Sequence, residues 1–135
     1  MTLIEWNNSL SVNVAEIDKQ HQQLVNMINE LNDAMKSGKG KDVLNDILTK
    51  LIKYTQGHFA TEEKYFDKFN YPDTEAHKEE HRALVQQVSD FKKQFDSGTV
   101  GLSVQIMEFL SNWLKKHIQG TDKKYSACFN ANGLK

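Results

Sequence analysis

The chain has 135 residues, of which 39% are hydrophobic and 26% charged, and its formal net charge is −1. These values are typical of an ordinary globular domain, so we assign residues 1–135 to a single domain. Acidic and basic residues are mixed along the chain, which argues against a nucleic-acid partner. The sequence shows no apolar run that could span a bilayer and no secretory signal, and its single cysteine, Cys128, excludes an intrachain disulfide. We therefore expect a cytoplasmic protein that is not a membrane protein.

The first 16 residues are predicted to form an ordered arm packed along the outside of the protein. This segment lacks helical periodicity but is too apolar for a free tail, because it contains Leu3, Ile4, Trp6, Leu10, Val12 and Val14.

Four helices are expected to follow, at about 17–37, 42–69, 73–96 and 102–119, with the last continuing to about 129. Within each, apolar residues recur in alternating steps of four and three, which keeps one seam facing one partner surface. Glycine-containing loops and a loop with the only proline, Pro72, separate the helices. Four amphipathic helices with short connections predict an all-α, antiparallel up-down-up-down four-helix bundle with an ordered N-terminal arm.

All the histidines of the chain lie on these inward-facing seams, and two acidic residues accompany them. Residues four apart lie one above the other on one helix face, which pairs His58 with Glu62 and His77 with His81. In an antiparallel bundle, the start of the first and third helices and the end of the second and fourth meet at one end. The sequence therefore predicts one cluster there, made of His21, His58, Glu62, His77, His81, His117 and Asp122.

Asp122 departs from this spacing, because it follows His117 by five residues. In an ideal helix these two side chains would point in different directions. Gly120 lies between them, so we expect a break or one inserted residue near Gly120 that turns Asp122 back to the core.

This cluster is interpreted as a metal site with two ions. Burying two carboxylates without partners would cost several kcal/mol each, and seven protein ligands are too many for one ion. Imidazole nitrogens together with bridging carboxylates are suitable ligands for transition metals. Iron is the metal that we expect, and manganese or zinc is the alternative. Two six-coordinate irons offer twelve positions. Five histidines, two bridging carboxylates and a bridging oxide or hydroxide fill eleven, which leaves one position for a small molecule.

The pattern His21, His58-x-x-x-Glu62, His77-x-x-x-His81 and His117-x-x-x-x-Asp122 resembles the hemerythrin family, in particular its single-domain bacterial members. Flanking residues also match, among them Ile17–His21, His58–Glu63, Tyr71-Pro72 and Trp113. The resemblance implies a di-iron centre that binds O2 on one iron. It assigns His77, His81 and His117 to the fully coordinated iron, His21 and His58 to the open iron, and Glu62 and Asp122 as bridges. Asn13 stands where relatives often have glycine.

Four core residues near the predicted open iron are interpreted as an apolar wall that retains bound O2: Leu24, Val25, Trp113 and Leu114. The predicted function is reversible O2 binding for storage or delivery, to an O2-consuming recipient that the sequence does not identify. Oxygen or redox sensing and di-iron enzyme chemistry on peroxide or nitric oxide are the alternatives. We expect no enzyme, because no histidine remains for acid–base catalysis once all are ligands.

Overall fold

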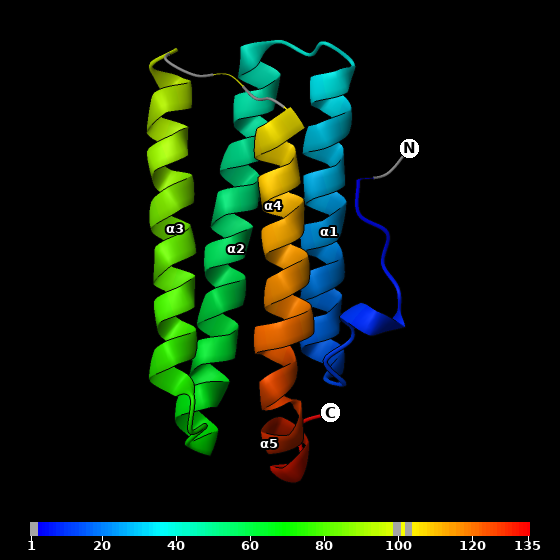
Figure 1. The fold of residues 1–135 in the computed structure, drawn as a ribbon, viewed down its shortest axis with the longest axis vertical. Helices are drawn as coiled ribbons and strands as arrows, with labels where there is room; N and C mark the ends of the chain where they lie inside the picture. Colours follow the sequence, from blue (N-terminus) through cyan, green and yellow to red (C-terminus); the bar gives the residue numbers. More distant parts are fainter. Residues whose placement is uncertain (1–2, 99–100, 102–103) are drawn as a thin grey trace.

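A computed structural model describes residues 3–98, 101 and 104–135. Four long helices run alternately up and down and pack side by side (Figure 1). They are α1 (Ala15–Lys36), α2 (Lys41–Phe69), α3 (Thr74–Asp96) and α4 (Val104–Lys116). No strand occurs in the described ranges, and none of the helices there is long and apolar enough to cross a bilayer. The prediction of an antiparallel four-helix bundle is confirmed.

The helix boundaries lie close to those expected from the periodicity. The first helix begins at Ala15, two residues earlier than predicted, and α2 ends at Phe69 as expected. The predicted start of the fourth helix, at 102, lies outside the described residues. After α4 the chain continues as a π-helical turn (His117–Thr121), a 3-10 turn (Asp122–Tyr125) and the short α5 (Ser126–Ala131).

The alternating apolar seams form the core of the bundle. Buried side chains include Ile17, Leu24, Ile28 and Leu31 of α1, Leu48, Leu51 and Phe66 of α2, Phe95 of α3, and Met107 and Leu114 of α4. Burial of apolar surface at about 25 cal/mol per Å² is the main force that holds such helices together. At the lower end of the bundle the same seams carry the histidines, so the packing that forms the core also positions the site.

The arm is ordered along α1, as the sequence predicted (Figure 1). Ile4, Leu10, Val12 and Val14 are all buried. The Asn29 side chain holds the start of the arm, since its Oδ1 accepts from the backbone N–H of Leu3 and of Ile4 at 3.0 and 2.9 Å. The arm thereby covers the outer side of the bundle.

The end of the arm turns into α1 at Asn13. Asp18 holds this turn, because its carboxylate accepts from the Ser11 hydroxyl at 2.6 Å and from the Val12 N–H at 2.8 Å. Asn13 has a φ of 60°, in the left-handed region that glycine adopts freely and asparagine tolerates. A glycine at this position would adopt the same conformation without strain.

Candidate metal centre

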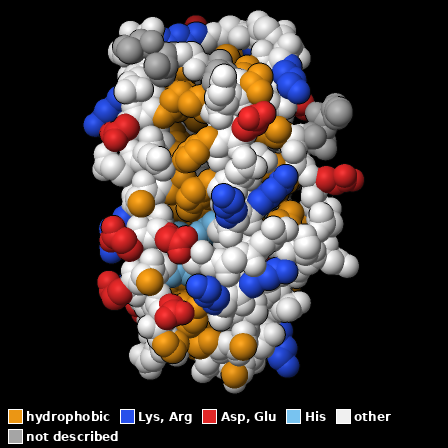
Figure 2. All heavy atoms as spheres, viewed as in Figure 1, with side chains coloured by type: hydrophobic (Ala, Val, Ile, Leu, Met, Phe, Trp, Pro, Cys, Tyr) orange, Lys and Arg blue, Asp and Glu red, His pale blue; other side chains and the backbone are white. Residues whose placement is uncertain are grey.

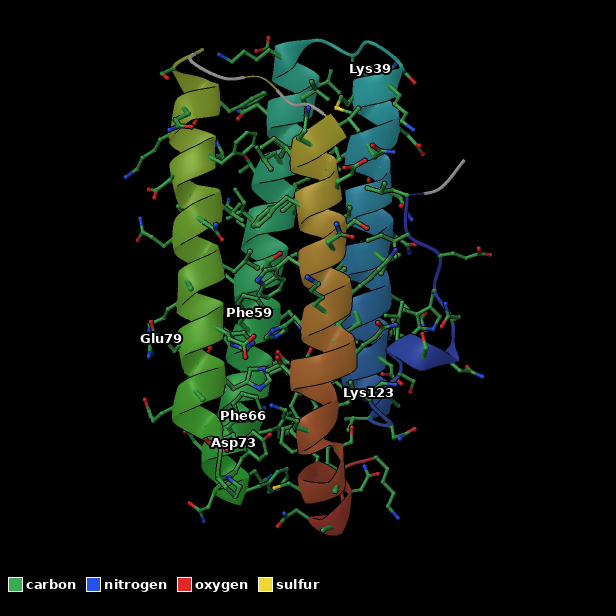
Figure 3. All side chains as sticks on the ribbon, in the orientation of Figure 1. Lys39, Phe59, Phe66, Asp73, Glu79 and Lys123 are labelled. Atoms are coloured by element: carbon green, nitrogen blue, oxygen red, sulfur yellow. The ribbon has the colours of Figure 1, made fainter. Side chains whose placement is uncertain are left out.

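The structure brings together all seven predicted ligand residues inside the lower half of the bundle. His21 comes from α1, His58 and Glu62 from α2, His77 and His81 from α3, and His117 and Asp122 from the turns after α4. Each is at most 3% exposed, so the imidazoles and carboxylates share one dry interior. Phe59 and Phe66, labelled in Figure 3, project from α2 beside them.

The seven residues divide into two groups that could each hold a metal ion. One group contains His77, His81 and His117, and the other contains His21 and His58. Glu62 and Asp122 belong to both groups. Within each group, one ligand atom from every residue lies within 4.8 Å of the others. Three histidines on one side, two on the other and two shared carboxylates suit a pair of adjacent ions.

The distances in the three-histidine group fit a common transition ion. The Nε2 atom of His117 lies 3.2 Å from the Nε2 atoms of both His77 and His81. Imidazole nitrogens bind transition ions at about 2.0–2.1 Å, so two of them at right angles around one ion are about 3 Å apart. On the opposite ring edges, His81 Nδ1 and His117 Nδ1 face the carboxylates of Glu63 and Glu80.

Asp122 and Glu62 lie between the two groups. Asp122 Oδ1 is 2.8 Å from His77 Nε2 and 2.9 Å from His117 Nε2, whereas its Oδ2 is 3.1 Å from His21 Nε2. Glu62 Oε1 is 3.2 Å from His81 Nε2 and 3.4 Å from His58 Nε2. Each carboxylate thus contacts histidines of both groups.

Several of these short contacts lack hydrogen-bond geometry. Among the described residues, both oxygens of Asp122, Oε1 of Glu62 and both ring nitrogens of His21 are buried without a hydrogen-bond partner. Buried polar groups are rarely left in this state, since each costs about 1–3 kcal/mol. Their lone pairs are placed to bind cations, so the donor set fits a dinuclear transition-metal centre.

Three of the histidines are held from behind through Nδ1. His58 Nδ1 lies 2.7 Å from Gln20 Oε1, His81 Nδ1 lies 2.9 Å from Glu63 Oε2, and His117 Nδ1 lies 3.3 Å from Glu80 Oε1. Because these partners accept, each ring carries a hydrogen on Nδ1, and Nε2 is the nitrogen that faces the cluster. The ring orientation is therefore set before any metal binds.

The protein environment also shifts the proton affinities of these groups. Burial lowers the pKa of His58 to about 4, although Glu62 opposes this shift. Burial likewise lowers the pKa of His81 to about 4, against the effect of Glu63. Neutral imidazole, the form that binds metals, is thereby favoured at both positions.

His117 and Asp122 behave as a charge pair. Burial disfavours the charged form of both, but Asp122 outweighs it and, with Glu62 and Glu80, raises the pKa of His117 to about 9. In turn, His117, His21 and His77 hold the pKa of Asp122 well below its usual range. The carboxylate is therefore ionised and available as a ligand.

A π-helical turn solves the irregular spacing of Asp122. The backbone N–H of Asp122 bonds to the carbonyl of His117, five residues earlier, as well as to that of Ile118 at the usual distance of four residues. The turn contains one extra residue, which rotates Asp122 back to the side occupied by His117. The inserted residue expected near Gly120 is thus present.

Aromatic rings pack against the imidazoles from several sides. Phe59 stacks on His81 with 3.7 Å between ring centroids, and Trp113 stacks on His117 at 4.4 Å. Phe66 contacts His77 at 4.6 Å. These rings leave the imidazoles little freedom to tilt and keep water away from them.

A small apolar cavity of about 50 Å³ adjoins the cluster. His21, His58 and His117 contribute to its lining, with Leu24, Trp113 and Leu114 from the predicted wall. Val25, the fourth predicted wall residue, is buried in the core but does not line the cavity. Apolar side chains also gather in a strip along α3 and α4 above the visible histidine atoms (Figure 2).

Sequence reasoning assigned no role in the site to Gln20, Glu63, Glu80, Phe59 or Tyr125. In the structure the Tyr125 hydroxyl donates to Glu62 Oε2. A sequence signal exists for three of them, because Gln20, Glu63 and Glu80 each adjoin a ligand residue along the chain. Which ligand they contact depends on helix packing, and in each case it lies on another helix.

Comparisons with known proteins agree with this geometry. The model of the hemerythrin HHE cation binding domain matches residues 12–128. Bacteriohemerythrin of Methylococcus capsulatus is 34% identical over 132 residues, covering 97% of this chain and all of that protein. Bacteriohemerythrin of Stenotrophomonas maltophilia is 31% identical over 126 residues, or 93% of this chain and 81% of that protein.

Solved structures show the same relationship. A crystal structure of wild-type hemerythrin superimposes with a TM-score of 0.89 at 34% identity, over 93% of this chain and 97% of that one. A hemerythrin mutant gives 0.91 at 33% identity, over 95% and 98% of the two chains. Fold, sequence and the buried cluster of histidines and carboxylates point the same way: the chain belongs to the hemerythrin family.

Proposed function

We propose that the protein binds O2 reversibly at a non-haem di-iron centre and serves in oxygen storage or delivery. The ligands would be His77, His81 and His117 for one iron and His21 and His58 for the other, with Glu62 and Asp122 bridging them together with an oxide or hydroxide. The observation that carries the proposal is the division into two groups, one with three histidines and one with two, that share both carboxylates. By this count the two-histidine iron keeps one open position.

The chemistry supplied by the irons would be electron donation to O2 and its recovery on release. The protein's own contribution is to hold the ligands and to exclude water. Nδ1 contacts fix the rings of His58, His81 and His117, and the surrounding aromatic rings restrict their tilt. Tyr125 holds Glu62 by a hydrogen bond to the oxygen that faces His21.

The apolar cavity supports binding of a small neutral molecule. A cavity takes up a water-sized molecule once its volume exceeds about 10–15 Å³, so this one has room for a diatomic gas. Its polar lining beyond the ligands consists of Thr55 and Gln56, and the Thr55 hydroxyl donates to the Leu51 carbonyl. Among the described residues that line it, the only acid–base groups are the proposed ligands, which supports a binding protein over an enzyme.

We also propose that residues 1–135 form one domain, because the arm, the four helices and α5 contribute to one continuous core.

The test is metal analysis followed by an optical spectrum of the reduced protein before and after air is admitted. We expect two irons per chain, and a visible absorption band that appears with O2 and disappears when O2 is removed, over several cycles. One metal per chain, or stoichiometric zinc from iron-replete cells, would contradict the di-iron assignment. Immediate irreversible oxidation with turnover of an added reductant would favour the enzyme alternative.

A further inference from the structure

The contacts behind the histidines differ between the two halves of the site. In the three-histidine group, His81 and His117 each face a carboxylate, Glu63 at 2.9 Å and Glu80 at 3.3 Å. In the two-histidine group, His58 faces the neutral amide oxygen of Gln20 at 2.7 Å. His21 Nδ1 and His77 Nδ1 have no hydrogen-bond partner among the described residues. Two anionic acceptors thus stand behind one group and one neutral acceptor behind the other.

Neighbouring contacts keep these acceptors in place. The Gln20 amide nitrogen lies 3.5 Å from the Thr61 hydroxyl, which turns the amide oxygen to His58. Thr121 donates to the same oxygen of Glu80 that faces His117, at 3.1 Å. The Glu63 and Glu80 side chains are 31% and 47% exposed. Water therefore reaches both carboxylates, so keeping them ionised costs much less free energy than it would for a fully buried carboxylate.

A hydrogen bond from Nδ1–H to a carboxylate makes the ligating imidazole more basic. Charge-assisted hydrogen bonds of this kind are roughly twice as strong as neutral ones, so an amide acceptor has a smaller effect. A more basic ligand donates more electron density and favours the higher charge on the metal that it holds.

From this asymmetry we propose that Glu63 and Glu80 are positioning residues that make the two metal positions electronically unequal. Acting through His81 and His117, they favour the ferric state at the three-histidine position. Gln20, acting through His58, keeps the two-histidine position easier to reduce. The inference rests on the proposed di-iron centre and assigns to each half of it a distinct share of the redox behaviour.

The test uses the iron-loaded protein and four single variants. Glu63→Gln and Glu80→Gln remove an anionic acceptor and keep the side-chain shape, and Gln20→Glu makes the converse change behind His58. Glu79→Gln is the matched control. Glu79 lies next to Glu80 on α3, pairs with Arg82 at 2.7 Å, and points outward (Figure 3). Glu79→Gln changes the net charge by the same amount as the variants at positions 63 and 80, but it alters no hydrogen bond to a histidine.

The readouts are the midpoint potentials of the two one-electron steps, from spectroelectrochemistry, and a Mössbauer spectrum of the half-reduced form. We expect each glutamine variant at positions 63 and 80 to shift the oxidised-to-reduced ratio about tenfold towards the reduced form, or about 59 mV for one electron. Gln20→Glu should shift it about as far in the opposite direction. Glu79→Gln should change it less than about twofold, because an exposed charge is screened by water.

Each outcome decides the inference. Equal shifts in Glu79→Gln and Glu80→Gln, or unchanged potentials in both variants at 63 and 80, would overturn it. Loss of iron from both of these variants would make the two residues structural supports only, which also overturns it. If the unmodified protein itself holds no iron, the proposed function fails. If that protein binds two irons and O2 while the potentials stay fixed, only the present inference fails.

Discussion

The hydroxyl of Tyr125 donates a hydrogen bond to Glu62 Oε2 inside the bundle, and both side chains are fully buried. Tyr125 lies in the turn after α4, whereas Glu62 lies on α2, so this bond ties the C-terminal segment to the opposite helix. Burial and the nearby Glu62 and Asp122 carboxylates raise the pKa of Tyr125 well above its usual value. The phenol is therefore neutral and remains a donor.

The first prediction concerns this bond. Tyr125→Phe leaves Glu62 Oε2 buried without its donor, so the metal-free protein should lose about 1–3 kcal/mol of unfolding free energy in urea. Tyr54→Phe is the control, because Tyr54 is only partly buried and lies on the same helix as Glu62. An equal loss in the two variants would show that the bond to Glu62 contributes nothing specific.

The second prediction concerns ligand removal. His77→Ala and His117→Ala should each lose iron and melt at a lower temperature, because metal that binds only the folded site stabilises the fold. Iron analysis and calorimetry on the same samples provide the measurement. Asn112→Ala, on the exposed side of α4, is the control and should keep both properties. Full iron content in either histidine variant would contradict the ligand assignment.

The third prediction concerns the cavity wall. Trp113→Ala should leave both irons bound, because Trp113 stacks on His117 and is not a ligand. The smaller side chain should admit water to the cavity. The rate at which the O2 adduct is lost by oxidation should therefore increase several-fold. The decay of the visible band in air measures this rate. Trp6→Ala removes the same side chain from the arm, and its decay should match that of the unmodified protein.

The fourth prediction concerns the pH dependence of the metal-free protein. His58 and His81 have a folded-state pKa of about 4, against about 6.5 in an unfolded chain. The unfolded chain binds more protons between these values, so the unfolding free energy should fall as the pH drops from about 6.5 towards 4. The folded-state pKa of His117 is about 9, so protonated His117 stabilises the fold fully below about pH 6.5. This contribution to the unfolding free energy is lost as the pH rises to 9.

Stability should therefore peak near pH 6.5, with the steeper decline on the acid side, where two histidines act together. Denaturant titrations at a series of pH values measure the profile. His117→Gln should remove the alkaline decline and leave the acid one. A profile that rises or falls steadily from pH 4 to 9 would contradict the assignment.

The fold was predictable because its periodicity is local. Alternating steps of four and three define one seam per helix, and His58 and Glu62 share that seam whatever the rest of the protein does. The antiparallel order then brings the predicted ligand residues of the four helices to one level. Even the displaced Asp122 could be anticipated, since a break or an extra residue near Gly120 is needed to return it to the side of His117.

The contacts behind the ligands could not be predicted in the same way. Gln20 adjoins His21 but contacts His58, and Glu80 adjoins His81 but contacts His117. Successive residues on a helix point about 100° apart, so the neighbour of an inward residue faces an adjacent helix. Which side chain it meets there depends on how the two helices are rotated and shifted, and local periodicity carries no information on either.

The π-helical turn at His117–Thr121 joins two stretches of the last helical segment whose inward-facing positions are offset from each other by one residue along the sequence. Before it, Leu110, Trp113 and His117 keep one phase, and after it Asp122, Tyr125 and Phe129 keep another. Deleting one residue within 118–121 would restore steps of four, three and four from His117 to Asp122, Tyr125 and Phe129, so an ordinary helix would keep all three side chains on the side of His117. Inserting one further residue there would instead turn Asp122, Tyr125 and Phe129 away together and dismantle the centre while every predicted ligand residue remained in the sequence, whereas the exposed loop at 37–40 should tolerate the same insertion.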